Sequence, residues 1–172
     1  PTGVQHSILT ILSNQAEKIS VESRPEYITE KRITQLQKSI QSASFEVGIG
    51  LETSNDVIRK NAINKGLTFL SYKKAAQLLR RHGMNVKTYV LLKPPFLTEK
   101  EALDDGRKTL RDATPFSDVI SLNPTNVQRH TIVEYLWKRD QYRPPWLWSI
   151  VEILKKHQNR GDVHLKCDTV GG

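Results

Sequence analysis

The chain has 172 residues, 37% of them apolar, which suits one domain with a core of ordinary size. Its 26 Lys and Arg residues outnumber 18 Asp and Glu residues, so the formal charge is +8. Such an excess favours polyanions such as RNA, although a solvated basic surface has the same composition. Cys167 is the only cysteine, which excludes an intrachain disulfide and is typical of a reducing, cytoplasmic compartment. No apolar run approaches the roughly 20 residues of a membrane helix, so we expect no membrane contact.

Both ends of the sequence look cut. The first residues, 1–4, are neither an initiator methionine nor a signal peptide, and residues 169–172 read as an arbitrary stop in a loop. We therefore expect a piece taken from the middle of a longer protein.

Short β-branched runs alternate with amphipathic helical segments along the chain. Strands are predicted at 18–22, 45–51, 85–92 and 118–122, and the segment 163–166 has the pattern of one more strand. Helices are predicted at 8–12, 29–40, 57–63, 71–82, 98–111, 132–138 and 146–156. This alternation indicates parallel strands that are covered by helices.

Local signals mark where several of these elements begin and end. Thr29 and Thr98 are good N-cap residues, and Gly83 is placed to end a helix in the left-handed conformation. The prolines at 94–95 stop the third strand, and Asn123-Pro124 stops the fourth.

The predicted fold is α/β, a partial TIM-type (β/α) barrel. No nucleotide-binding glycine fingerprint follows a strand, which favours a barrel over a doubly wound sheet. About four parallel strands cannot close a barrel, so we expect an open arc with helices outside. We assign residues 1–160 to this barrel segment and residues 161–172 to the start of a further segment.

The ends of the four strands are polar, and in βα barrels the working groups lie at these ends. Two carboxylates, an Arg, a Lys and amide side chains would share one rim of the sheet if the strands lie side by side. Such a rim suits a zwitterionic ligand, although each end on its own could be an ordinary turn. The strand-end segments are 22–25, 50–53, 93–96 and 123–126.

Gly48 and Gly50 do not form a phosphate loop, because they lie inside an apolar run and no Lys-Ser or Lys-Thr follows them. Glycines inside a strand are typical where a ligand or neighbouring backbone comes close.

The segment 142–149, Tyr-Arg-Pro-Pro-Trp-Leu-Trp-Ser, is the most distinctive in the chain. Tyr142, Trp146 and Trp148 could stack on a base or on the guanidinium of Arg143. The alternative is that both tryptophans anchor the last helix to the core, which is the commoner use of an aromatic after a proline turn.

The sequence offers few other candidates for a metal site or for nucleophilic catalysis. His164 and Cys167 have the spacing of half a metal site, but structural zinc normally takes four ligands, so we expect no metal held by this chain. No Ser-His-Asp arrangement or nucleophile elbow is visible.

Taken in order, the strand-end segments resemble the radical S-adenosylmethionine (SAM) superfamily, and more narrowly the archaeal radical enzymes of archaeosine biosynthesis. The similarity is carried by segments 21–28, 48–53, 63–66, 89–96, 121–128 and 142–149. The resemblance implies strands three to six of a six-strand barrel. It implies SAM and a [4Fe–4S] cluster as cofactors of the whole protein, and a tRNA substrate.

The resemblance also implies a set of binding positions. Residues that would contact the cofactor are Glu22, Arg24, Glu52, Lys65, Lys93 and Asn123, with Lys65 facing the methionine carboxylate. Arg143, Trp146 and Trp148 would contact the substrate. No catalytic residue is assigned.

One departure from the superfamily decides what the chain can do alone. The superfamily holds its cluster with a CxxxCxxC loop after the first strand, and this sequence has no such loop. We expect the loop upstream of Pro1, removed by design or by proteolysis, and expect this piece to be inactive with no cofactor bound.

The predicted function of the whole protein is the cleavage of a lysine adduct on a 7-deazaguanine base of tRNA, a lyase-type reaction. Two alternatives stay open: a radical SAM enzyme with another RNA substrate, of the methylthio- or acetyl-transfer type, and a non-catalytic tRNA-binding module that supports a partner subunit. An open sheet edge also predicts a homodimer or aggregate at high concentration.

Overall fold

The computed structural model describes residues 2–40, 43–157 and 163–167. Its centre is one sheet of five parallel strands in the order β1-β2-β3-β4-β5, so neighbours in the sequence are neighbours in space. The strands are β1 (Lys18–Glu22), β2 (Ser44–Glu52), β3 (Asn85–Leu92), β4 (Val119–Pro124) and β5 (His164–Cys167). The predicted α/β class with parallel strands is confirmed.

The helices begin and end close to the predicted residues. They are α1 (Thr2–Gln15), α2 (Glu30–Gln37), α3 (Asp56–Asn61), α4 (Phe69–Arg81), α5 (Glu99–Ala113), α6 (Ile132–Trp137) and α7 (Leu147–His157), with short 3₁₀ turns η1 (Pro25–Tyr27) and η2 (Thr114–Phe116). Thr29 and Thr98 accept from backbone amides at the starts of α2 and α5, and Gly83 has a φ of +71°. These three cap predictions are therefore confirmed.

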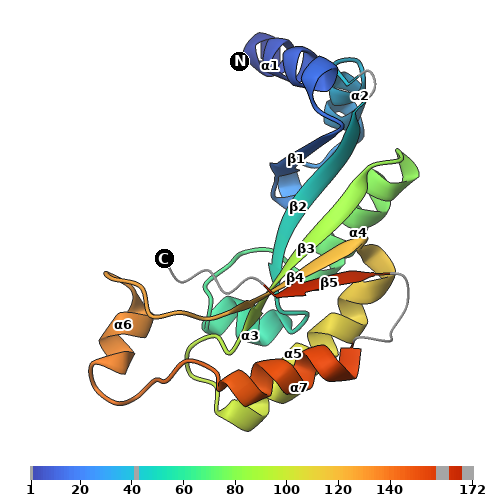
Figure 1. Ribbon diagram of the computed structural model, residues 1–172. Coiled ribbons are helices and arrows are strands. Elements are labelled where there is room, and N and C mark those ends of the chain that lie inside the picture. Colours follow the sequence, from blue (N-terminus) through green and yellow to red (C-terminus); the bar gives the residue numbers. More distant parts are fainter. Residues whose placement is uncertain (1, 41–42, 158–162, 168–172) are drawn as a thin grey trace.

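Helices α4, α5 and α7 lie along one face of the sheet, as Figure 1 shows. The core forms between these helices and the strands, so successive residues of β3 alternate between half-buried and buried. Val86, Val90 and Leu92 are buried toward the helices, whereas Lys87 and Tyr89 on the other face are only half-buried. That other face is the one left available for a ligand.

Three details differ from the sequence-based expectations. The sheet has five strands instead of about four, because β5 pairs with β4. Strand β4 continues through Pro124, which lies opposite Leu92 and beyond the last described pair with β5, Leu122–Cys167. Helix α3 ends at Asn61, so Ile63 lies outside it, and Asn64 with a φ of +56° turns the chain away.

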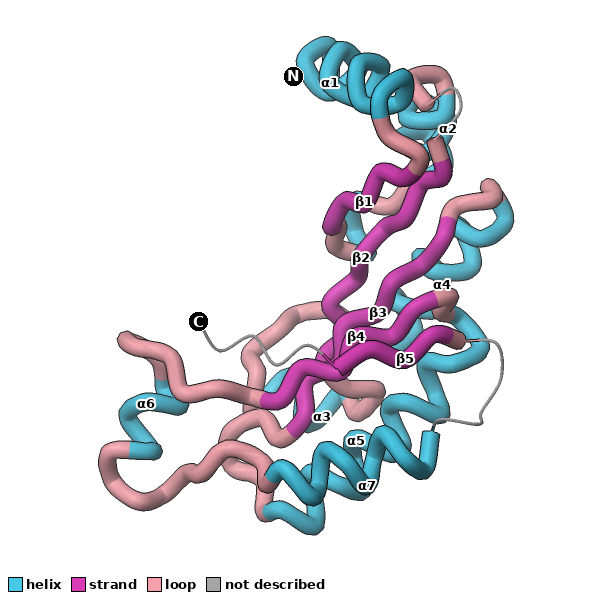
Figure 2. The backbone as a smooth tube through the Cα atoms, viewed as in Figure 1, coloured by secondary structure: helices cyan, strands magenta, loops and turns pink. Residues whose placement is uncertain are grey.

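The segment between β4 and α7, residues 125–146, leaves the sheet and carries α6 on an extension that we call the arm (Figure 2). Val133, Leu136 and Tyr142 form a small apolar cluster inside the arm, separate from the main core. None of the helices in the described part of the chain is long and apolar enough to cross a membrane.

Candidate functional site: a cleft at the strand ends

A cleft of about 650 Å³ lies at the carboxyl-terminal ends of the strands. Five of the six residues predicted to bind the cofactor line it, and they come from β1, β2, β4 and the loops that follow β1 and β2. The full lining is Gln5, Glu22, Ser23, Arg24, Tyr27, Arg32, Gly48, Gly50, Glu52, Lys65, Tyr89 and Asn123. The strand ends therefore converge as the parallel arrangement requires, while the binding roles of these residues stay predictions.

The centre of the cleft is an ion pair between the end of β2 and the loop after α3. Lys65 Nζ donates to Glu52 Oε1 at 2.7 Å, and both side chains are partly exposed, at 26% and 19%. Glu52 sits in a three-residue turn closed by Thr53 N donating to Leu51 O, with a φ of +64°. A non-glycine residue in this conformation is strained, and such strain gathers at binding sites.

The fully buried guanidinium of Arg59 holds this turn in place through hydrogen bonds to backbone carbonyls. Arg59 Nε donates to Leu51 O at 3.0 Å, Nη1 donates to Leu67 O at 3.2 Å, and Nη2 donates to Thr53 O. Arg59 also pairs with Asp56 in the first turn of α3. Leu51 O and Thr53 O flank Glu52, and Leu67 O lies two residues after Lys65, so Arg59 connects the two segments that carry the ion pair.

The two glycines of β2 form the floor of the cleft. A Cβ on Gly50 would lie 2.4 Å from Lys65 Nζ and 2.7 Å from Glu52 Oε1, and one on Gly48 would lie 2.9 Å from Tyr89 Cε2. The sequence predicted the close approach of a ligand or of neighbouring backbone, whereas the atoms nearest to both glycines belong to side chains of the site.

Tyr89 is one of several cleft residues that the sequence analysis did not single out, together with Gln5, Tyr27 and Arg32. Burial and the neighbouring Glu22 carboxylate raise the pKa of the Tyr89 phenol, and Lys87 Nζ lies 4.7 Å from its ring centroid. The signal for Tyr89 was the period-two alternation of β3, which places it on the face opposite the core together with the charged Lys87.

Lys93 is absent from the cleft lining, contrary to its predicted place beside the other strand ends. Its side chain is 5% exposed, its Nζ donates to Glu99 Oε2 at 2.8 Å, and its φ is +59°. This left-handed turn after β3 directs the lysine to the first turn of α5 and the base of the arm. Lys93 is therefore paired with Glu99 at a distance from the cleft, and its binding role stays a prediction.

The arm junction gathers around Glu99. Trp146 N donates to Glu99 Oε1 at 2.9 Å, and Arg143 Nη2 lies 3.5 Å from Glu99 Oε2. Tyr142 donates its hydroxyl to Lys93 O at 2.8 Å, and burial raises the pKa of this phenol to about 12. The neutral tyrosine and the Lys93–Glu99 pair thus connect the arm to the sheet.

Arg143 stacks on Trp146, with its guanidinium carbon 4.1 Å from the ring, so the predicted guanidinium–tryptophan contact is confirmed. Trp146 and Trp148 are 56% and 79% exposed. The alternative that both tryptophans anchor the last helix to the core is therefore wrong. The main chain of Trp146 serves the junction, while its ring and that of Trp148 face outward.

His164 and Cys167 do not form half of a metal site. They are three positions apart on β5, and successive side chains of a strand alternate faces, so the two point to opposite sides of the sheet. Among the described residues, no group of three His, Cys, Asp or Glu side chains could hold a metal ion.

Comparison with solved structures shows which fold this arrangement of strands and helices belongs to. The archaeal Elp3 of Methanocaldococcus infernus, with an N-terminal deletion, matches 95% of this chain and 38% of its own with a TM-score of 0.73 at 20% identity. The radical SAM methyltransferase TsrM of Kitasatospora setae matches 68% and 23% with a TM-score of 0.50 at 14% identity. The chain has part of the radical SAM barrel fold. No model of a protein family matches it.

The curated relatives are more specific. The chain is homologous to archaeosine synthase subunit beta: it is 44% identical to that of Methanosarcina acetivorans over 167 residues, 94% of this chain and 48% of the relative. It is also 44% identical to that of Thermococcus kodakarensis over 147 residues, 86% of this chain and 45% of the relative. The chain thus spans about half the length of the curated relatives that it matches.

Proposed function

We propose that this chain is part of the barrel of an archaeosine synthase β-type subunit that acts on tRNA. The observation that carries the proposal is the 44% identity to two such subunits across nearly the whole chain. The proposed reaction breaks a carbon–nitrogen bond in a lysine adduct on a 7-deazaguanine base and leaves an amidine. The formal charge of +8 supports a polyanionic substrate.

The cleft at the strand ends fits SAM in size and in chemistry. Its volume of about 650 Å³ lies in the usual range for a small-molecule site. The carboxylates of Glu22 and Glu52 can accept from an ammonium group or from ribose hydroxyls, and Lys65 and Arg24 can hold a carboxylate. Bound SAM, once reduced by one electron, would supply the chemistry that removes a hydrogen atom from an unactivated carbon of the substrate. Glu52 and Lys65 would position SAM, and Asn123 would line the side toward the arm.

The cluster does not fit this chain. The sequence contains one cysteine, and cluster ligation takes several thiolates. We therefore propose that this chain contributes the binding of cofactor and substrate, and no ligand of a cluster.

A partner is part of the proposal, because the relatives are named as β subunits. We propose that the whole protein works beside a second subunit, which prepares the lysine-bearing base or receives its product.

Two experiments test the function at different levels. Equilibrium dialysis of the whole protein with SAM should show binding that Glu52→Gln weakens, because the substitution removes the negative charge that pairs with Lys65. The same dialysis with Gly66→Ala, where an added Cβ meets nothing within 4 Å, should match the wild type. Equal SAM affinity in all three proteins would remove the cofactor assignment.

The second experiment uses the whole protein with its cluster reconstituted and lysine-modified tRNA. Mass spectrometry should detect 5′-deoxyadenosine and the archaeosine nucleoside. If a cluster-loaded protein forms neither, the archaeosine assignment fails even where SAM binds.

A further inference from the structure

The arm, residues 125–146, displays aromatic side chains that its own small core does not use. Val133 and Leu136 point inward and are buried, whereas Tyr135 and Trp137 of the same helix are each 50% exposed. With Trp146 at the end of the arm and Trp148 in the first turn of α7, they make four exposed aromatic side chains on or directly after the arm. Exposed aromatic surface of this extent is typical of a binding site.

Two of these rings already carry a stacked guanidinium. Arg139 lies 3.6 Å from the centroid of Tyr135, and Arg143 lies 4.1 Å from that of Trp146. A guanidinium plane and an aromatic ring are the two flat surfaces on which nucleic-acid bases stack. The arm also has four Lys and Arg residues against two Asp and Glu residues, so phosphates can lie beside the stacked bases.

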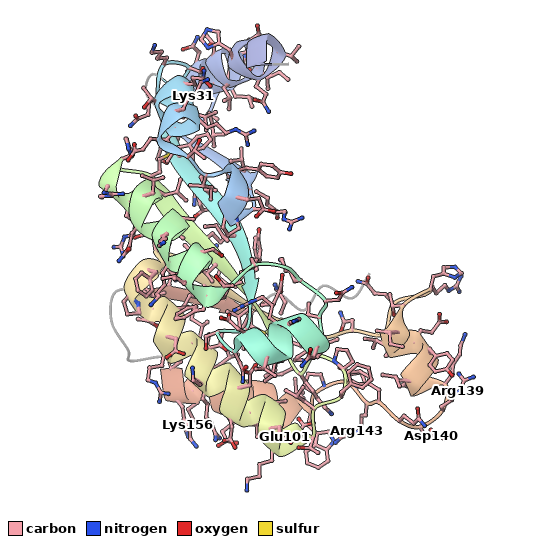
Figure 3. The ribbon with its side chains drawn as sticks, turned by 180° about the vertical axis from the view of Figure 1, so that it is seen from behind. Lys31, Glu101, Arg139, Asp140, Arg143 and Lys156 are labelled. Carbon is pink, nitrogen blue, oxygen red and sulfur yellow. The ribbon has the colours of Figure 1, made fainter. Side chains whose placement is uncertain are left out.

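The arm leaves the sheet beside the cleft. Asn123 lines the cleft, and the arm begins two residues later. Figure 3 shows Arg139 and Arg143 along this extension, at the opposite end of the molecule from Lys31 on α2. A strand of RNA held on the arm would therefore pass close to the cleft.

We infer that the arm binds unpaired RNA bases, which stack on the Tyr135–Arg139 and Trp146–Arg143 pairs and on Trp148. Unpaired bases are required because rings and guanidinium planes bind base faces, and a duplex hides these faces. The inference rests on the proposed function and makes it more specific: the arm grips nucleotides that flank the modified base while the cleft receives the base.

The three tryptophans of the chain are Trp137 and Trp146 on the arm and Trp148 in the first turn of α7, so tryptophan fluorescence reports on the arm and its junction with α7. The test titrates the chain with an unstructured RNA about 12 nucleotides long, a length within the site sizes of single-strand binders. We expect quenching of tryptophan fluorescence by the single strand, and little quenching by the same RNA annealed to its complement.

Variants locate the contact. Arg139→Ala and Trp148→Ala should each weaken binding about tenfold by fluorescence anisotropy, because each removes one stacking surface. Lys31→Ala removes a positive charge from the far end of the molecule and should change the affinity less than about threefold. Unchanged circular dichroism of the variants shows that folding is not the cause.

Three outcomes would overturn the inference. The first is RNA binding without quenching, and the second is equal loss in Arg139→Ala and Lys31→Ala, since both mean that charge alone holds the RNA. The third is wild-type RNA affinity in the arm variants with lost binding of a purified partner subunit, which would make the arm a protein-docking surface. Because these experiments measure RNA binding, their outcome does not depend on whether the whole protein makes archaeosine.

Discussion

At the scale of single residues, the cleft depends on two positions of β2 where a side chain would interfere or the backbone is strained. Gly50 leaves room for the Glu52–Lys65 pair, and Glu52, two residues after it, adopts a φ of +64°. The register between β2 and β3 shifts between these two residues. The end of β2 is thus shaped to present a carboxylate and not to continue the ladder.

Gly50→Ala should leave the protein folded and disrupt the cleft. The added Cβ meets the movable ends of Lys65 and Glu52, so the free energy of unfolding should fall by less than about 1 kcal/mol. Displacing the charged pair should weaken SAM binding at least about tenfold. Dialysis and urea denaturation measure the two effects, with Gly66→Ala as the matched control. Wild-type SAM affinity in Gly50→Ala would contradict the arrangement described.

The strain at Glu52 makes an independent prediction. Glu52→Gly and Glu52→Ala both remove the carboxylate, but only glycine accepts a positive φ without cost. The glycine variant should therefore be more stable than the alanine variant by about 1 kcal/mol. The midpoints of urea denaturation measure the difference. An alanine variant as stable as the glycine variant would mean that the turn relaxes.

At the scale of elements, the first turn of α5 connects the arm to the sheet through Glu99. Burial alone would raise the pKa of this carboxyl group, but hydrogen bonds from Lys93, Ser149 and the Trp146 amide outweigh it. The pKa of Glu99 in the folded state therefore lies below its usual value of 4.5. The charged Glu99 carboxylate therefore stabilises the junction fully at pH values above 4.5, and this stabilisation is lost as the pH falls through the lowered pKa of Glu99.

Acid should thus loosen the arm junction, which tryptophan fluorescence can follow. We expect a change in emission as the pH falls below 4.5, and no such change in Glu99→Gln, whose junction lacks the charge at every pH. Glu46, Asp56 and Asp112 also have lowered pKa values, so the comparison with this variant isolates the junction from the other carboxyl groups. An identical acid transition in both proteins would place the cause elsewhere.

At the scale of the whole molecule, the sheet is open and one helix shows an apolar face. Among the described strands, β1 and β5 each have one neighbour, and Val4, Ile8 and Ile11 of α1 are each more than half exposed. Open edges and exposed apolar faces both favour association with another protein surface.

The chain should therefore self-associate as its concentration rises. Ile8→Lys combined with Ile11→Lys should lower the average mass in sedimentation equilibrium, because the charges make burial of the α1 face unfavourable. Val57→Lys, at an exposed apolar position on α3, is the matched control and should behave as the wild type. A wild-type chain that stays monomeric at high concentration would disprove the expectation.

The sequence by itself determined the parallel α/β fold and most of the cleft. Hydrophobic runs, N-cap threonines and Gly83 act within a few residues, so local pattern was enough to place β3 at its observed bounds and to start α5 at Thr98. Parallel strands end at one edge of a sheet, which brought Glu22, Glu52 and Asn123 together as predicted.

Tertiary structure decided the direction of individual side chains. The left-handed turn at Lys93 sends that lysine to Glu99 and away from the cleft, and no local pattern announces a positive φ at a lysine. The same is true of Trp146 and Trp148: the sequence favoured their burial against the core, whereas the folded chain leaves both side chains exposed. Burial and side-chain direction depend on partners distant in the sequence, and those partners exist only after the chain has folded.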